Sequence, residues 1–199
     1  IAVLVARATD AETRCYPVVE MIFRGQGNVL DLLLAPAEIS AGQAAAAVDI
    51  AVRTVGALGA VGVFGVEMFL TGKNDLLVNE VAPRTHNSGH YTIDACPTDQ
   101  FEQHLRAILG LPLGDTDLLV PAAMINLLGE TGSRGRPVIQ GLGAALALPG
   151  VCVHFYGKST TKPMRKMGHV TVLDNDLEKA RSNAERVRDL ITITGENQT

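Results

Sequence analysis

The sequence lacks many of the features by which common protein classes are recognised. Its three cysteines, Cys15, Cys96 and Cys152, are far apart and form no CxxC spacing. This argues against a disulfide framework and against a metal–thiolate site, so we expect reduced thiols and a cytoplasmic protein. The uncharged stretch from Pro137 to Val153 is interrupted by glycine and proline, which excludes a membrane span there.

The common nucleotide-binding and hydrolase motifs are also missing. The chain contains no GxxxxGKS/T, GxGxxG, GxSxG or HExxH segment. A formal net charge of −4 makes nucleic acid an unfavourable partner for the chain as a whole. The 199 residues are 47% hydrophobic and 19% charged, which is enough for one domain with an appendage or two small domains. Because the chain begins at Ile1 inside an apolar stretch, we expect a fragment that carries part of a site.

The pattern of apolar residues, caps and turns predicts an α+β fold. The predicted strands are residues 1–8, 15–23, 61–70, 76–81 and several short segments within 118–173. The first predicted helix starts after Ser40, which forms a capping box with Gln43, and stops at Gly59. The second covers residues 99–109 and is capped by Thr98, and the third covers about 177–191 after Asp176. This order divides the chain into an α+β unit at residues 1–112 and a small β-rich domain at 113–199 that ends in a helix.

Two glutamates in the predicted central hairpin are the first candidate site. Glu67 lies in one strand and Glu80 in the other, and their sequence neighbours are apolar. Two carboxylates on one half-buried face repel each other, and a divalent cation that prefers oxygen ligands, Mg²⁺ or Mn²⁺, would resolve this. The alternative is that one glutamate faces solvent while the other pairs with Arg84.

The register of the hairpin decides between these alternatives. A four-residue turn pairs Leu70 with Asp75, so that Glu67 faces Val78 and Glu80 faces Gly65. The two carboxylates are then diagonal neighbours on one face, about 7 Å apart at Cα. A turn one residue longer moves them to opposite faces of the sheet.

A polar loop follows Glu80. Arg84 lies four residues on, behind a proline that sets the chain direction, and its planar guanidinium can bind a small oxyanion beside a metal. Further side chains with donors surround a glycine in the same loop: His86, Asn87, Ser88 and His90. A single histidine is usually structural, but this cluster directly adjoins a candidate metal ligand, which favours a functional loop.

A second polar cluster is basic. No acidic residue lies between Glu130 and Asp174, whereas six basic residues do: Arg134, Arg136, Lys158, Lys162, Arg165 and Lys166. A solvated basic loop is one interpretation, and a nucleic-acid surface is another, although Phe155 and Tyr156 offer few aromatic rings for stacking. A phosphate-bearing small substrate fits as well, because Lys158 supplies a point charge and Arg165 a fork.

Four segments together resemble a known family. They are "GVEMFLTGKNDLLVNEVAPRTHNSGHYTIDA", "QFEQHLRAILGLPLGDT", "MINLLGE" and "HFYGKSTTKPMRKMGH". These closely resemble the C-terminal half of 5-(carboxyamino)imidazole ribonucleotide synthetases, ATP-grasp ligases of purine biosynthesis also called phosphoribosylaminoimidazole carboxylase ATPase subunits. The resemblance covers nearly the whole chain. It implies that residues 1–112 are the C-terminal part of an ATP-grasp domain, an antiparallel sheet with helices.

The resemblance also implies an activity and a role for each motif residue. The family uses ATP to convert bicarbonate to carboxyphosphate, whose carboxyl group is captured by the amine of aminoimidazole ribonucleotide. The implied roles are Mg²⁺ ligation by Glu67 and Glu80, ATP binding by Asn79 and Glu80, catalysis by Arg84 (holding bicarbonate), His86 and Asn87, and binding of the ribonucleotide 5′-phosphate by Lys158 and Arg165.

The chain departs from the family pattern in two respects. The family's N-terminal domain and nucleotide-binding lid would precede Ile1, so we expect the isolated chain to bind ATP weakly and turn over negligibly. Met21 and Phe23 stand where the family usually has asparagine and histidine, and the change at Phe23 affects one nucleotide contact. The family is commonly dimeric, which predicts a homodimer.

Two other functions stay open on the sequence. One is another ATP-grasp ligase, such as a formate-using glycinamide ribonucleotide transformylase or a biotin carboxylase-like protein, which shares the glutamate pair and the arginine. The other is a non-catalytic fragment that serves as a dimerisation surface.

Overall fold

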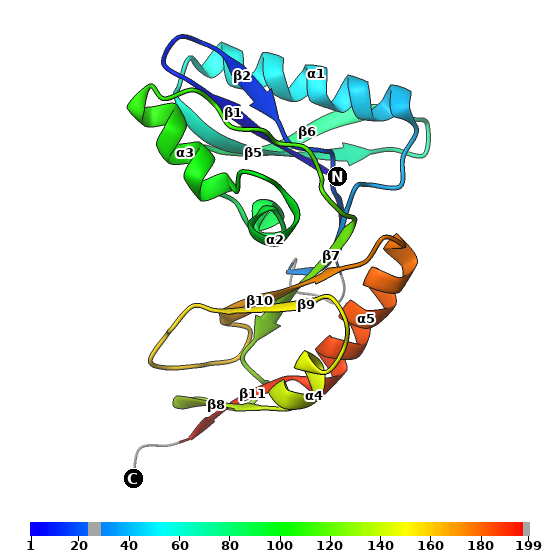
Figure 1. The fold of residues 1–199 in the computed structure, drawn as a ribbon, viewed down its shortest axis with the longest axis vertical. Helices are drawn as coiled ribbons and strands as arrows, with labels where there is room; N and C mark the ends of the chain where they lie inside the picture. The colour runs from blue at the N-terminus through cyan, green and yellow to red at the C-terminus, as the bar shows by residue number, and fades with distance from the viewer. Residues whose placement is uncertain (24–28, 197–199) are drawn as a thin grey trace. The chain divides into compact units, whose positions relative to one another are not determined.

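The computed structural model describes residues 1–23 and 29–196, which form two compact units (Figure 1). The first unit comprises Ile1–Met21 and Leu34–Val120, and the second comprises Ile22–Leu33 and Pro121–Thr199. The sequence predicted a single division after residue 112. In the structure Ile22–Leu33 is grouped with the second unit, and the first unit ends at Val120. The α+β class is confirmed, since antiparallel sheets and helices occur in both units.

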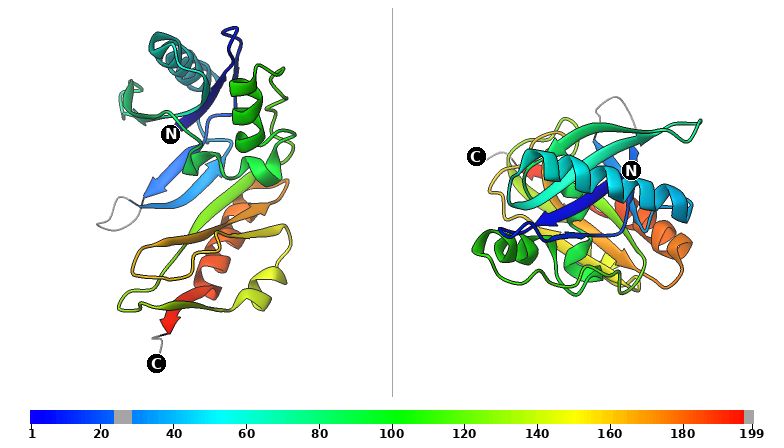
Figure 2. Two further views of the ribbon diagram at one scale, coloured as in Figure 1. Left: turned by 90° about the vertical axis from the view of Figure 1, so that its left-hand side faces the viewer. Right: turned by 90° about the horizontal axis from the view of Figure 1, so that it is seen from above.

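The first unit is built on a four-stranded antiparallel sheet in the order β2-β1-β5-β6. The strands are β1 (Ala2–Arg7), β2 (Thr13–Cys15), β5 (Gly62–Leu70) and β6 (Leu76–Ala82). Helix α1 (Ala41–Leu58) covers one face, and α3 (Gln100–Leu109) lies against the other (Figures 1 and 2). Because both faces are covered, the first five residues of β1 are all buried instead of alternating between core and solvent.

Side-chain alternation along β5 separates the core from the site. Phe64, Val66 and Met68 pack with Ala51 and Val55 of α1 in a buried apolar cluster. Successive strand residues point to opposite faces, so Gly65 and Glu67 face away from α1. The α1 core thus fixes which face of the sheet presents the Glu67 carboxylate.

The ends of the two longer helices of this unit show one correct and one wrong prediction. Ser40 and Gln43 form the predicted capping box of α1, and Gly59 ends the helix in the left-handed conformation at φ 63°. At α3 the cap is Asp99, whose carboxylate accepts hydrogen bonds from two backbone N–H groups of the first turn. The predicted cap Thr98 is instead buried, and its carbonyl accepts a hydrogen bond from the Tyr16 hydroxyl at 2.9 Å.

The second unit contains a five-stranded sheet in the order β3-β4-β7-β10-β9 and a two-stranded sheet of β8 and β11. The strands are β3 (Glu20–Phe23), β4 (Leu30–Ala35), β7 (Ala122–Leu128), β8 (Arg136–Gln140), β9 (Val151–Phe155), β10 (Lys166–Leu173) and β11 (Thr192–Glu196). Helix α5 (Leu177–Leu190) packs on β7 and β10 and is capped by Asp176, as predicted.

Three parts of this pattern differ from the sequence prediction. Residues 142–148, one of the short segments predicted as strands, instead contain the short helix α4 (Leu142–Leu146). The predicted strand 15–23 divides, because Cys15 pairs with β1 whereas β3 joins the five-stranded sheet. Strand β11 was not predicted, although it pairs with β8 over five residues of each strand.

Among the described residues, no helix combines the length and the apolar composition needed to cross a bilayer.

Candidate functional site

The hairpin of β5 and β6 brings Glu67 and Glu80 directly opposite each other. Leu70 pairs with Leu76, so the turn has five residues and, by itself, would send the glutamates to opposite faces. A bulge corrects this, since Met68 pairs with Val78 and Glu67 with Glu80, which leaves Asn79 as the extra residue.

The predicted register was therefore wrong in detail. Glu67 faces Glu80 and not Val78, and the two glutamates are direct and not diagonal neighbours. The two glutamates share a face because the longer turn and the one-residue bulge each reverse the side-chain direction, so that their effects cancel. Asn79, predicted to lie beside a nucleotide, is exposed at this bulge.

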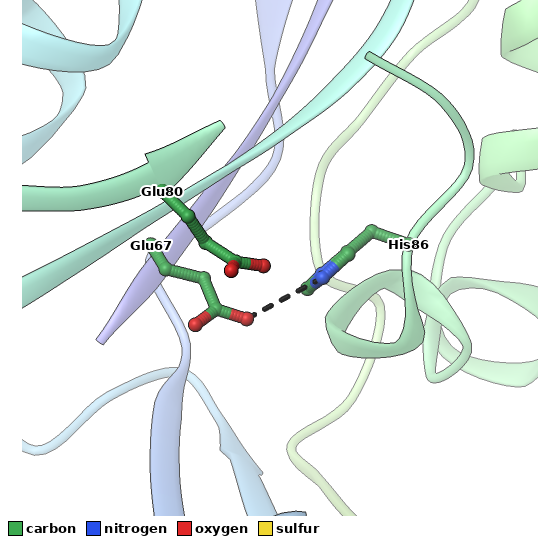
Figure 3. Close-up of side chains that lie close together, drawn as sticks. All are labelled: Glu67, Glu80 and His86. Carbon is green, nitrogen blue, oxygen red and sulfur yellow. Dashed lines mark ion pairs between the residues drawn. The ribbon is translucent and has the colours of Figure 1, made fainter. Parts of the chain in front are cut away.

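The two carboxylates lie close together and beside a histidine ring (Figure 3). One carboxylate oxygen of each glutamate and a ring nitrogen of His86 all lie within 4.8 Å of one another. Nε2 of His86 is 3.4 Å from Oε1 of Glu67. The Glu67 and His86 side chains are only 16% and 8% exposed, whereas Glu80 is exposed. Such a half-enclosed pair of carboxylates, open on one side, has the donor set that a hard divalent cation prefers.

His86 reaches the carboxylates because the sheet leaves room for it. A side chain at Gly65, two residues before Glu67 on the same face, would place its Cβ 2.7 Å from Cγ of His86. His86 was predicted from the sequence as a catalytic residue of the loop, but its contact with Glu67 was not predicted. The signal was the glycine at a strand position on the site face, which marks a close approach by another segment.

Arg84 and Asn87 follow in the same loop with different environments. Arg84 is exposed, and its Nη1 donates to the Thr85 carbonyl at 2.9 Å, so its guanidinium fork is accessible. Asn87 opens the short 3-10 helix η1 (Asn87–Gly89), and its Nδ2 is buried without a hydrogen-bond partner in the described part of the chain. A buried donor in that condition is available to a bound ligand or water.

The basic loop, residues 156–165 between β9 and β10, holds both of the predicted phosphate-binding residues. Lys158 donates from Nζ to the Lys166 carbonyl, and Nζ lies 5.3 Å from the centroid of the Tyr156 ring. Arg165 donates from Nη1 to the carbonyl of Thr160 at 3.0 Å and to its Oγ1 at 2.8 Å. Both cations are half-buried and held by backbone carbonyls, which orients them without neutralising them.

The sequence-predicted residues thus form two groups in the structure. Glu67, Glu80 and His86 meet in the first unit, with Arg84 and Asn87 on the same loop as His86. Lys158 and Arg165 lie in the second unit. Phe23, one of the two departures from the family pattern, is exposed at the end of β3.

Two of the cysteines have raised thiol pKa values. Burial raises the pKa of the Cys15 thiol to about 11 and that of the Cys96 thiol to about 12. Because the thiolate is the nucleophile, neither cysteine is suited to covalent catalysis.

Comparison with known proteins places these features in context. A family model for the ATP-grasp domain matches residues 1–101, and one for the phosphoribosylaminoimidazole carboxylase C-terminal domain matches residues 122–183. The chain is 44% identical to the N5-carboxyaminoimidazole ribonucleotide synthase of Bacillus subtilis over 87% of its own length and 43% of that protein.

Solved structures show the same likeness. The crystal structure of the Thermotoga maritima N5-carboxyaminoimidazole ribonucleotide synthetase matches with a TM-score of 0.93 and 53% identity, over 98% of this chain and 52% of that one. The Aspergillus clavatus N5-carboxyaminoimidazole synthase, solved with ADP and 5-aminoimidazole ribonucleotide, matches with a TM-score of 0.86 and 36% identity, over 95% and 50%. The chain therefore spans about half of each solved relative.

Proposed function

Because this chain belongs to the ATP-grasp family and carries the C-terminal domain of phosphoribosylaminoimidazole carboxylases, we propose that it forms part of a ligase that carboxylates 5-aminoimidazole ribonucleotide. The reaction would consume ATP and bicarbonate and give 5-(carboxyamino)imidazole ribonucleotide, ADP and phosphate in purine biosynthesis. The observation that supports this most is the direct opposition of Glu67 and Glu80 beside the Arg84 loop. We further propose a cytoplasmic homodimer.

The donor set at the carboxylate pair fits the divalent ion that such a reaction needs. Glu67 and Glu80 would otherwise repel across a half-buried strand pair, and both offer the oxygen ligands that Mg²⁺, or alternatively Mn²⁺, prefers. When bound there, the ion would neutralise charge on the ATP phosphates. Asn79, at the bulge next to Glu80, would then lie beside the nucleotide.

The residues of the loop suit the activation of bicarbonate. In that step a bicarbonate oxygen attacks the γ-phosphorus of ATP, the bond to ADP breaks and carboxyphosphate forms. The accessible Arg84 guanidinium would hold the anion by two parallel N–H bonds, which also brings it into line for attack. The buried Asn87 amide would supply one more donor to the same anion. Positioning and charge neutralisation provide most of the catalysis in phosphoryl transfer.

The second step requires the enzyme to hold the ribonucleotide by a group that does not react, which is its 5′-phosphate. The amine nitrogen of the ribonucleotide attacks the carboxyl carbon, the bond to phosphate breaks, and the amine gives up a proton. Lys158 and Arg165 would bind the 5′-phosphate of the ribonucleotide, exchanging their present carbonyl partners for phosphate oxygens.

Acceptor dependence tests the proposal directly. The protein with its complete coding sequence should hydrolyse ATP only when bicarbonate and aminoimidazole ribonucleotide are both present, and the product should be the carboxyamino ribonucleotide. Turnover with glycinamide ribonucleotide and formate, and none with aminoimidazole ribonucleotide, would contradict it and would assign the chain to the other ATP-grasp ligase.

The 199-residue chain alone is a second measurement. It should turn over negligibly, because it spans about half of the solved relatives. Robust activity of this chain would show that residues 1–199 already contain a complete site.

A further inference from the structure

A buried glutamine on α3 holds the loop that carries His86. Gln100 is fully buried, and its Oε1 accepts a hydrogen bond from the His86 backbone N–H at 2.8 Å. Its Nε2 donates to the His86 carbonyl at 2.9 Å and lies 3.0 Å from Nδ1 of His90. The amide therefore pairs with both backbone groups of one residue, as a neighbouring strand would, and contacts a second histidine as well.

These partners determine the orientation of the amide and the proton positions on His90. A backbone N–H can only donate and a carbonyl can only accept, so the oxygen and nitrogen of Gln100 cannot be exchanged. The amide nitrogen is a donor, and Nδ1 of His90 must accept from it. A neutral His90 ring then carries its proton on Nε2.

The His86 ring is set in the same way by its neighbour. Its Nδ1 is 3.3 Å from the donating backbone N–H of Ser88 and 2.8 Å from the Ser88 Oγ. Because only an unprotonated nitrogen can accept from a backbone N–H, the Ser88 contact assigns the ring proton to Nε2, the atom 3.4 Å from Oε1 of Glu67. In this tautomer His86 presents an N–H group to Glu67, so its Nε2 is not available as a third metal ligand.

Further hydrogen bonds and close packing hold the network in place. Oγ1 of Thr92 accepts from the Gln100 backbone N–H at 3.0 Å and donates to the Gly89 carbonyl at 2.6 Å. A Cβ at Gly89 would lie 2.3 Å from Cδ2 of Leu4 and 2.5 Å from Oε1 of Gln100. The loop backbone therefore packs directly on the sheet and on the amide.

We propose that Gln100 is a positioning residue for the carboxylate pair: it holds the His86 backbone so that Nε2–H of His86 orients the Glu67 carboxylate towards Glu80. This inference rests on the proposed function, in which Glu67 and Glu80 bind the divalent ion. Groups that contact a metal ligand directly, as His86 contacts Glu67, commonly change metal affinity or activity about ten- to a hundred-fold when they are removed, and Gln100 acts through His86.

The chain supplies a matched control for this residue one turn further along α3. Gln103 is also fully buried, its Nε2 donates to the Gly114 carbonyl at 2.9 Å, and its Oε1 accepts from the Gly114 N–H at 2.8 Å. The bond pattern matches that of Gln100, but the partner loop does not contain the carboxylates or the histidines. The two glutamines therefore share the paired bonds to one backbone residue and differ in what they position and in the additional contact of Gln100 with His90.

The first experiment compares Gln100→Met with Gln103→Met in the protein with its complete coding sequence. Both variants should lower Tm by similar amounts, because each leaves one backbone N–H and one carbonyl without partners. Only Gln100→Met should reduce kcat for bicarbonate- and aminoimidazole-ribonucleotide-dependent ATP hydrolysis, by about ten- to a hundred-fold. The KM for the ribonucleotide should change little. Equal losses of kcat in the two variants would overturn the proposal.

The second experiment reads the histidine rings by ¹⁵N NMR and needs no activity. In the wild type, His86 and His90 should both carry the proton on Nε2. In Gln100→Met the His90 ring should become a mixture of tautomers. His104, whose Nδ1 accepts from the Val63 N–H at 3.1 Å, should keep its tautomer in both proteins and reports on the integrity of α3.

The two readouts separate the possible failures. A wild-type His86 ring protonated on Nδ1 would overturn the positioning proposal even if the enzyme is active. A wild-type protein without the expected turnover would refute the proposed function, whereas an Nε2–H signal on His86, together with one on His90 that depends on Gln100, would still support the positioning role. The wild-type spectrum decides the tautomers even if Gln100→Met does not fold.

Discussion

The carboxylate site and the basic loop hold their charged groups by different means. Glu67 lies on a sheet face whose direction is set by the α1 core, and its neighbour His86 is held by Gln100 from α3. Lys158 and Arg165 are held by carbonyls of Lys166 and Thr160, close to them in the chain. The first site depends on packing between distant segments, whereas the second depends on local hydrogen bonds. We therefore expect substitutions near the first to alter geometry and those in the second to alter charge alone.

The largest effect should come from removing one charge of the carboxylate pair. Glu80→Gln should reduce turnover of the complete protein roughly a thousand-fold, because the bound ion supplies several kcal/mol of charge stabilisation. Stability should change by less than about 0.5 kcal/mol, since Glu80 is exposed. Steady-state kinetics and urea unfolding measure the two quantities. Glu38→Gln, another exposed glutamate of the first unit, is the control and should leave both unchanged; near-normal turnover of Glu80→Gln would refute the metal assignment.

Substitutions in the basic loop should act on substrate affinity. Arg165→Ala should raise the KM for aminoimidazole ribonucleotide about ten- to a hundred-fold, the equivalent of one charge-assisted hydrogen bond of about 1.5–3 kcal/mol. Lys158→Ala should act in the same direction. Lys162→Ala is the matched control, because Lys162 is an exposed cation of the same loop without an assigned role. If Lys162→Ala raises KM as strongly, the loop acts only through its net charge.

Filling the space beside His86 should separate packing from charge. Gly65→Ala introduces a Cβ 2.7 Å from Cγ of His86, so the ring must move away from Glu67. We expect a loss of about 1–3 kcal/mol in the free energy of unfolding from this overpacking, together with a lower kcat. Gly56→Ala in α1 meets nothing within 4 Å and should instead stabilise the helix by about 0.5–1 kcal/mol. Unfolding in urea and kinetics check both variants; a Gly65→Ala protein with normal stability and kcat would show that the ring position is not tightly held.

The smallest effect concerns the buried thiols. The ordinary pKa of a thiol is 9.0, and burial raises the folded-state pKa of Cys15 to about 11 and that of Cys96 to about 12. The folded protein therefore holds these protons more tightly than the unfolded chain. Their contribution to stability is fully present below pH 9 and decreases as the pH rises towards 11 to 12. Alkylation by iodoacetamide at pH 7.5 should spare both cysteines in the folded protein and modify them in urea. Rapid modification of Cys96 in the folded protein would contradict its burial, and rapid modification of the half-buried Cys15 would contradict its raised pKa.

Local patterns were sufficient for much of the fold. The capping box at Ser40, the stop at Gly59 and the cap at Asp176 were predicted from neighbouring residues and are confirmed. Errors arose where a distant partner decides the outcome, as at Thr98, whose place as a cap is taken by Asp99 while its carbonyl binds Tyr16. The division of residues 15–23 between two sheets is of the same kind, because strand pairing depends on partners far along the chain.

The residue types at the site, two carboxylates, an arginine and a polar loop, could be identified from the sequence because their chemistry is carried by each side chain and by its order along the chain. The direct opposition of Glu67 and Glu80 could not, because it depends on a five-residue turn and a bulge at Asn79 whose effects on side-chain direction cancel. The contact of His86 with Glu67 and the role of Gln100 were equally hidden. They arise when α3 packs against the sheet and places a buried amide against the loop backbone, an arrangement between segments that only the folded chain brings together.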